Sequence, residues 1–106
     1  MNLPPYTALQ FAVIAELIPG EMEGRDLRKA LREKHGIKRS GPSFYNQMSR
    51  LEEAGQVKGE YRLKEVGDQH VRARWYKLTG KGTKDYNKTR EFYSDTLQVG
   101  GAAAAG

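Results

Sequence analysis

A change in the spacing of apolar residues at Gly55 constrains the fold of this chain more than any other feature of its sequence. In 41–54, apolar side chains recur every three or four positions, which is the repeat of a helix with one buried face. Beyond Gly55, the segments 57–63 and 71–78 are rich in β-branched and aromatic residues and have the character of strands. The 106 residues fit one domain. We therefore expect an α+β fold, mainly α-helical, with a small two-stranded β-hairpin.

Start and stop signals delimit four helical segments. Thr7 and Gln10 have the spacing of a capping box, in which each side chain bonds the backbone amide of the other residue. Gly36 suits the left-handed cap at the end of a helix, and Ser40 is placed to cap the start of the next one. The expected bounds are 7–18 for the first helix, 24–34 for the second, 41–54 for the third and 79–99 for the fourth.

Positive charge is concentrated in the middle of the chain. Residues 34–90 hold 14 lysines and arginines against six acidic residues, whereas 1–33 and 91–106 are slightly acidic, in a chain of net charge +5. A basic segment of this size usually faces a polyanion such as nucleic acid, or an anionic membrane. The alternative at this point is a merely solvated surface.

The residues needed for most enzymes and metal centres are scarce. With no cysteine and only His35 and His70, the sequence offers no disulfide scaffold, thiolate nucleophile or histidine metal cluster. It contains no nucleophile elbow and no phosphate-binding glycine loop, so we expect neither an enzyme nor a cofactor. No apolar run is long enough to span a bilayer, and the first residues do not resemble a signal peptide. We expect a cytoplasmic protein without membrane contact.

The third helical segment and the hairpin carry the side chains best suited to DNA. With Phe44, Met48 and Leu51 on the buried stripe, short polar side chains face outward, and arginine and asparagine among them can form paired hydrogen bonds with guanine and adenine. In the hairpin, Arg72 and Arg74 share one face near the tip, where backbone phosphates are the expected partners. The predicted DNA-binding residues are Lys38, Arg39, Ser40, Ser43, Tyr45, Asn46, Gln47, Ser49, Arg50, Arg72 and Arg74. The alternatives are an ordinary solvent face on the helix and charges that keep the hairpin edge soluble.

The tip of the hairpin is expected to be a longish loop over residues 64–70. Arg62 and Lys64 are expected to be available across the strand pair from Arg72 and Arg74. The tip would then be a basic surface with no core behind it.

The first helical segment is too apolar to be covered on one side only. Gln10 and Glu16 are its only polar interior positions, and the last helical segment has a thin apolar stripe that needs a partner. We expect the two helices to build a homodimer interface. The predicted dimerisation residues are Leu9, Phe11, Val13, Leu17, Tyr86, Tyr93 and Leu97. The alternative is burial of the first helix wholly within one chain.

Three helices, a basic hairpin and a last helix follow one another as in a winged helix-turn-helix domain, with the third helix as recognition helix and the hairpin as wing. Within this class the chain resembles the PadR-like transcriptional regulators. The similar stretches are Thr7-Ala8-Leu9-Gln10-Phe11, Gly24-Arg25-Asp26-Leu27, Ser40-Gly41-Pro42-Ser43-Phe44-Tyr45, Arg50-Leu51-Glu52-Glu53-Ala54-Gly55 and the wing exit Arg74-Trp75-Tyr76-Lys77-Leu78-Thr79. The sequence departs from the family pattern at Pro42-Ser43-Phe44 and across 68–72, which puts the DNA sequence preference in doubt and not the fold.

The resemblance implies a dimeric regulator, usually a repressor, that binds double-stranded DNA at a palindromic operator. In some family members a small aromatic or hydrophobic effector bound between subunits releases the DNA. The chain would divide into a DNA-binding domain over 1–78, a dimerisation helix over 79–99 and a low-complexity tail over 100–106. Trp75 could line an effector site, although packing of the wing onto the body is favoured. The alternative function is a winged-helix protein-interaction module without DNA binding.

Overall fold

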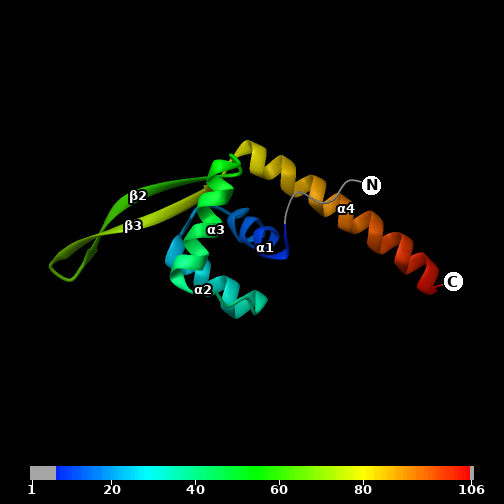
Figure 1. Cartoon of the computed structure of the whole chain (residues 1–106), viewed down its shortest axis with the longest axis horizontal. Helices are drawn as coiled ribbons and strands as arrows, with labels where there is room; N and C mark the ends of the chain where they lie inside the picture. Colours follow the sequence, from blue (N-terminus) through cyan, green and yellow to red (C-terminus); the bar gives the residue numbers. More distant parts are fainter. Residues whose placement is uncertain (1–6, 106) are drawn as a thin grey trace.

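The computed structural model describes the backbone of residues 7–105 and the side chains of residues 7–92, 94 and 95. The elements are α1 (Ala8–Leu17), β1 (Met22–Glu23), α2 (Gly24–His35), α3 (Gly41–Glu53), β2 (Val57–Val66), β3 (Gln69–Leu78) and α4 (Gly80–Ala105). The first three helices form a compact body, from which the β2–β3 hairpin and α4 project in opposite directions (Figure 1). The predicted α+β winged helix-turn-helix fold is confirmed.

The helix ends lie where their capping residues place them. The amide of Gln10 donates to Thr7 Oγ1 over 3.3 Å and the amide of Thr7 donates to Gln10 Oε1 over 3.0 Å, so the capping box is formed. Gly36 ends α2 in the left-handed region with φ of 66°. Ser40 caps α3 because its hydroxyl oxygen accepts a hydrogen bond from the amide of Ser43 over 3.2 Å.

One apolar core joins the three helices to the base of the hairpin. Each helix contributes side chains that are almost fully buried, and Val57 and Tyr76 join them from the two long strands. The buried core residues are Ala12, Val13, Ile14, Leu17, Leu27, Leu31, Phe44, Met48, Leu51, Val57 and Tyr76. The predicted buried stripe of α3 is thus confirmed.

This burial changes the predicted dimer interface. Val13 and Leu17 are each only 1 % exposed within a single chain, because they belong to the apolar core. A single chain already covers these two side chains, which weighs against them as contacts of a partner; the dimer interface itself stays a prediction. Leu9, Phe11 and Tyr86 remain partly exposed, while the side chains of Tyr93 and Leu97 lie outside the described residues.

The sheet is longer and has one more strand than the sequence led us to expect. Its order is β1-β3-β2, all antiparallel, and β2 pairs with β3 from Val57 opposite Leu78 to Val66 opposite Gln69. The predicted long loop over 64–70 is wrong, because the two strands continue to a tight turn. That turn needs only two residues, since Gly67 takes a φ of 63° that other residues rarely adopt.

The last helix, α4, is 26 residues long and continues through the segment predicted to be a low-complexity tail. Alanine has the highest helix propensity, which explains why 102–105 can extend the helix. Near its start, the ring of Tyr86 stacks on Phe11 of α1 with 5.0 Å between the ring centroids. Among the described residues, no helix is both long and apolar enough to cross a membrane.

Candidate nucleic-acid interface

The outward face of α3 is polar and accessible. Because Phe44, Met48 and Leu51 turn inward, Asn46 and Arg50 are exposed on the other side of the helix. The remaining predicted residues of α3 take two positions: Ser49 and Tyr45 are exposed on its flank, and Ser43 and Gln47 are half-buried. Side chains on this exposed strip have the donors and acceptors needed to contact base edges.

The loop before α3 presents two cations beside its N-terminus. Lys38 and Arg39 are both exposed, and the guanidinium of Arg28 on α2 donates to the carbonyl of Arg39 over 2.9 Å. The hydroxyl oxygen of Ser40 already accepts the capping hydrogen bond from the amide of Ser43. The DNA contact predicted for Ser40 would therefore use the same hydroxyl group. The loop is therefore held by α2 and brings positive charge to the start of α3.

The outer surface of α2 is a set of cations that sequence reasoning did not assign to the site. Arg25, Arg28, Lys29 and Arg32 are all exposed, and together with Tyr45 of α3 they line a hollow of about 590 Å³. The signal was present, because positions 25, 28, 29 and 32 repeat with helical spacing on the side opposite Leu27 and Leu31. We name Arg25, Arg28, Lys29, Arg32, Lys38 and Arg39 the α2 basic face.

The cations of the α2 basic face have no carboxylate partner in the part of the chain that the structure describes. Within residues 7–95 as described, none of its six cations has a carboxylate oxygen within 4.0 Å. Arg28, Arg32, Lys38 and Arg39 also line a second hollow of about 360 Å³ with Ile37 and Ser40. Uncompensated cations at close spacing on a surface attract phosphates.

On the wing, Arg72 and Arg74 lie on the face that packs toward α3. Arg74 is opposite Tyr61 in the strand pair and Arg72 is opposite Leu63. The guanidinium carbons lie 4.5 Å and 4.6 Å from the Tyr61 ring centroid for Arg72 and Arg74, within cation–π distance. Arg74 also forms an ion pair with Glu52 in the last turn of α3, whereas Arg72 is exposed. The two arginines share a face as predicted, but Arg74 is ion-paired, whereas Arg72 has no ion pair among the described residues.

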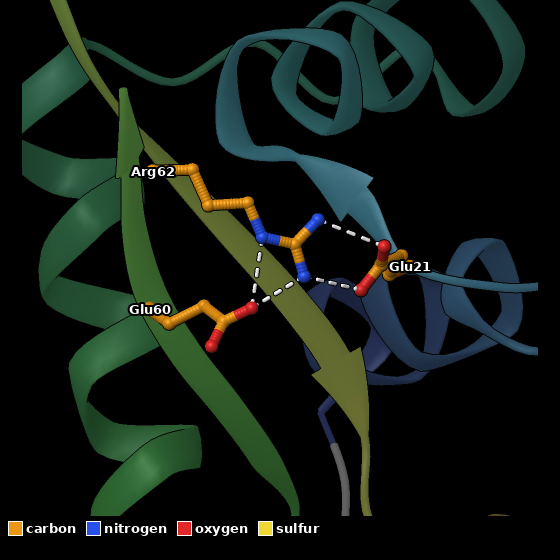
Figure 2. Close-up of polar contacts among 3 residues, drawn as sticks. All are labelled: Glu21, Glu60 and Arg62. Atoms are coloured by element: carbon orange, nitrogen blue, oxygen red, sulfur yellow. Dashed lines mark hydrogen bonds and ion pairs between the residues drawn. The ribbon is translucent and has the colours of Figure 1, made fainter. Parts of the chain in front are cut away.

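Arg62 and Lys64 lie on the opposite face of the wing. Figure 2 shows the Arg62 guanidinium held between the carboxylates of Glu21 and Glu60, with its two Nη atoms 2.8 Å and 2.7 Å from the Glu21 oxygens. Lys64 Nζ lies 3.0 Å from Glu23 Oε2. The expectation that these two cations join Arg72 is therefore wrong. Arg62 is opposite Ala73, which lies between Arg72 and Arg74 in β3. Because neighbouring side chains of a strand point to opposite faces, Arg62 lies on the face away from Arg72 and Arg74.

The ion pair between Arg62 and Glu21 stabilises the charged forms of both side chains. The hydrogen bond from Arg62 lowers the pKa of the Glu21 carboxyl, and the hydrogen bond between the same two groups raises the pKa of Arg62.

Trp75 lies beneath the Arg62 guanidinium, with 4.9 Å between its ring centroid and Arg62 Cζ, beside a hollow of about 80 Å³. That volume is small next to the roughly 300 to 1,000 Å³ of ordinary ligand sites. The contact supports packing as the role of Trp75.

A groove separates α3 from the wing and brings together residues far apart in the sequence. It has a volume of about 410 Å³ and is lined by Tyr45, Ser49, Glu52, Tyr61, Arg72, Arg74 and Tyr76. Four of the predicted DNA-binding residues meet here, while Asn46 and Arg50 do not line it. Burial raises the pKa of the Tyr76 hydroxyl to about 12, so this side chain is uncharged at physiological pH. No cluster of three or more metal-binding side chains occurs among the described residues.

Comparison with known proteins places this architecture among regulators of transcription. No protein-family model matches the sequence, and no curated protein matches it. Among solved structures, a transcriptional regulator from Clostridium thermocellum is 25 % identical with a TM-score of 0.69, over 86 % of this chain and 84 % of that one. A PadR family transcription regulator from Clostridium difficile is 17 % identical with a TM-score of 0.75, over 88 % of this chain and 94 % of that one.

A third similar structure contains nucleic acid. Bacillus subtilis PadR in complex with operator DNA is 21 % identical, with a TM-score of 0.63, over 77 % of this chain and 47 % of that one. The resemblance to the PadR-like fold is thus confirmed over most of the chain.

Proposed function

We propose that this chain, which shares its fold with PadR-family transcriptional regulators, binds double-stranded DNA sequence-specifically and acts as a dimeric repressor. The observation that carries the proposal is the position of the exposed strip of α3, which has the uncompensated α2 basic face on one side and Arg72 on the other. Phosphate contacts from the flanks would orient the helix, and Asn46 and Arg50 would contact the bases.

The proposed dimer would use α4 and the exposed part of α1. A single long helix gains little stability by itself, and beyond Phe92 the described side chains of α4, Ser94 and Asp95, are exposed. A second copy related by a two-fold axis would cover α4 with the same surface twice. Phe11 and Tyr86 stack where the two helices meet, and Leu9 is partly exposed on α1, so we place these three residues in the interface. A small aromatic effector, if one acts, would bind between the subunits.

This arrangement assigns residues 1–78 to DNA binding and 79–99 to dimerisation, in a protein that acts in the cytoplasm. Two recognition helices related by the two-fold would address half-sites about one helical turn apart in a palindromic operator.

The experiment that tests the proposal is selection of bound duplexes from random DNA, followed by binding measurements at several salt concentrations. We expect an enriched palindrome and an affinity that falls steeply with salt, with a log–log slope near −5 for about six phosphate contacts. A flat salt response, or no binding at low salt, would remove DNA from the proposal.

The dimer is tested separately by sedimentation, which should give a dimer at tens of micromolar protein.

A second candidate is a protein-interaction module, and one observation favours it. Leu63, Val66 and Val71 are 75 %, 55 % and 39 % exposed on the outer half of the wing, where a soluble domain gains nothing from apolar side chains. A wing that binds another protein would do so with little dependence on salt. Binding that is insensitive to salt, together with no affinity for DNA, would favour this function over the first.

A further inference from the structure

The ion pair between Glu52 and Arg74 connects the recognition helix to the middle of the wing. Glu52 is in the last turn of α3, and only residues 54–56 separate that helix from β2. The side chains of Glu52 and Arg74 are 23 % and 24 % exposed, so solvent screens this contact less than it screens the exposed ion pairs of the surface. A contact at this place can set the angle between α3 and the hairpin.

The surroundings of the pair are crowded. The Arg74 guanidinium lies 4.6 Å from the Tyr61 ring centroid and 5.8 Å from that of Tyr76, so aromatic rings lie beside it in the groove. Gly59 of β2 provides the remaining space. A Cβ at that position would overlap Glu52 Oε1 and lie 2.7 Å from Arg74 Nη2. Any larger residue at 59 must therefore shift the ends of these two side chains.

The pair lies part of the way along the hairpin, so a movement of the wing at the pair becomes larger at the tip. Hydrogen bonds from the Thr79 hydroxyl to the carbonyl of Gly55, and from the Thr79 amide to the carbonyl of Gln56, fix the base of the wing. Arg74 lies four residues beyond Leu78, or about 13 Å further out, and the turn lies about 30 Å from the base. A displacement of the wing at Arg74 is therefore roughly doubled at the tip.

We propose that Glu52, Arg74 and Gly59 act together as a positioning device that fixes the wing against the recognition helix, and that Arg74 does not contact phosphate. This inference rests on the proposed DNA binding, because its role is to present α3 and Arg72 at one fixed spacing. The positioning role replaces the predicted DNA contact of Arg74 with a contact inside the protein. It also gives a function to Glu52, an acidic residue close to the proposed DNA-binding surface.

The two possible roles of Arg74 predict opposite effects of Glu52→Ala on the affinity for DNA. If Arg74 contacted phosphate, Glu52→Ala would remove a repelling and competing charge and strengthen binding. If the pair positions the wing, Glu52→Ala weakens binding to the selected duplex, by about three- to tenfold for loss of a coupled pair. Arg74→Gln should weaken binding to a similar extent and leave the salt slope unchanged, whereas Arg72→Ala should reduce the slope by about one for each phosphate that Arg72 neutralises.

Gly59→Ala is the variant that changes no charge. It should reproduce the loss seen with Glu52→Ala, because its methyl group displaces the pair while both charges remain. Glu53→Ala is the matched control, since Glu53 is the neighbouring acidic residue, is exposed, and has no ion pair among the described residues. It should bind as well as the wild type or slightly better. Thermal melts of each variant identify any that fail to fold; if Glu52→Ala is one of these, Gly59→Ala and Arg74→Gln carry the test.

A measurement without DNA tests the geometry directly. The chain has no cysteine, so Glu53→Cys and Asp68→Cys introduce two unique sites for spin labels on α3 and at the wing turn. Labelled protein is diluted into an excess of unlabelled protein, so that each dimer carries one labelled copy. We expect Gly59→Ala to broaden the distance distribution.

The possible failures are distinguishable. If the wild type binds no DNA, the proposed function fails. If the wild type binds DNA and Glu52→Ala binds equally well or better, or Arg74→Gln reduces the salt slope, the positioning role alone is wrong.

Discussion

Removal of one cation from the α2 basic face should weaken DNA binding by an amount that can be calculated. Arg32 is exposed, lines both hollows of that face, and has no carboxylate near it among the described residues, so Arg32→Ala removes a free charge and leaves every ion pair intact. One phosphate contact releases about 0.9 counterion, which is worth about 1 kcal/mol at about 0.15 M salt. A dimer contains the residue twice. Kd should therefore rise about 30-fold and the salt slope should fall by about 1.8.

Lys34→Ala is the matched control for this measurement. Lys34 is also an exposed cation of α2, but its Nζ lies 3.4 Å from Glu16 Oε2, on the side of the helix that faces α1. Both variants change the net charge of the dimer equally, and fluorescence anisotropy with the selected duplex gives both slopes. If the two variants lose affinity equally, net charge attracts the DNA and no oriented α2 surface exists. If only Lys34→Ala loses affinity, DNA lies against the other side of α2.

Three further predictions concern bases, the back of the wing and pH. Asn46→Ala and Arg50→Ala should each cost about 1 to 3 kcal/mol on the preferred duplex and blur the preference at particular base pairs, which repeated selection would detect. Arg62→Ala should lower the melting temperature and leave the salt slope of DNA binding unchanged, since its charge is already paired; a reduced slope would place DNA on the back of the wing. The hydrogen bond from His35 lowers the pKa of the Glu16 carboxyl below 4.5, so the stabilisation is complete above pH 4.5 and is lost as the pH falls further. Melts of Glu16→Gln and wild type should therefore converge in acid, and a gap that persists at about pH 2 would contradict this.

The helices were predictable because their signals are local. A capping box, a C-terminal glycine and a stripe of apolar side chains each act within four residues, and all three appear where the sequence places them. The two-residue strand β1 had no such signal. Met22 and Glu23 become a strand only because β3 lies beside them, opposite Tyr76 and Trp75. A contact between residues more than 50 positions apart leaves no trace in a local pattern.

The hairpin shows why composition alone misjudges strand length. Residues 64, 65 and 70 have polar side chains that are common in loops, so the sequence suggested a loop, but each is held in the ladder by a partner on the other strand. Both strands extend two or three residues further toward the turn than the sequence suggested. This difference matters because the position of the turn fixes which side chains of the two strands share a face. With Gly67 as the first residue of the turn, Arg72 faces α3 and Arg62 faces away.

Two groups of cations in this chain differ in their ion pairing, and the net charge of +5 does not distinguish them. On the back of the wing, Arg62 and Lys64 are neutralised by carboxylates from the segment at β1, and beneath its front Arg74 is neutralised by α3. These three pairs brace the hairpin from both sides. The unpaired cations of α2 and the following loop lie together on the body, beside the recognition helix. Three cations of the wing are thus used in internal ion pairs, whereas a close group of unpaired cations comes from α2, a helix whose side chains a sequence-based prediction centred on α3 and the wing does not include.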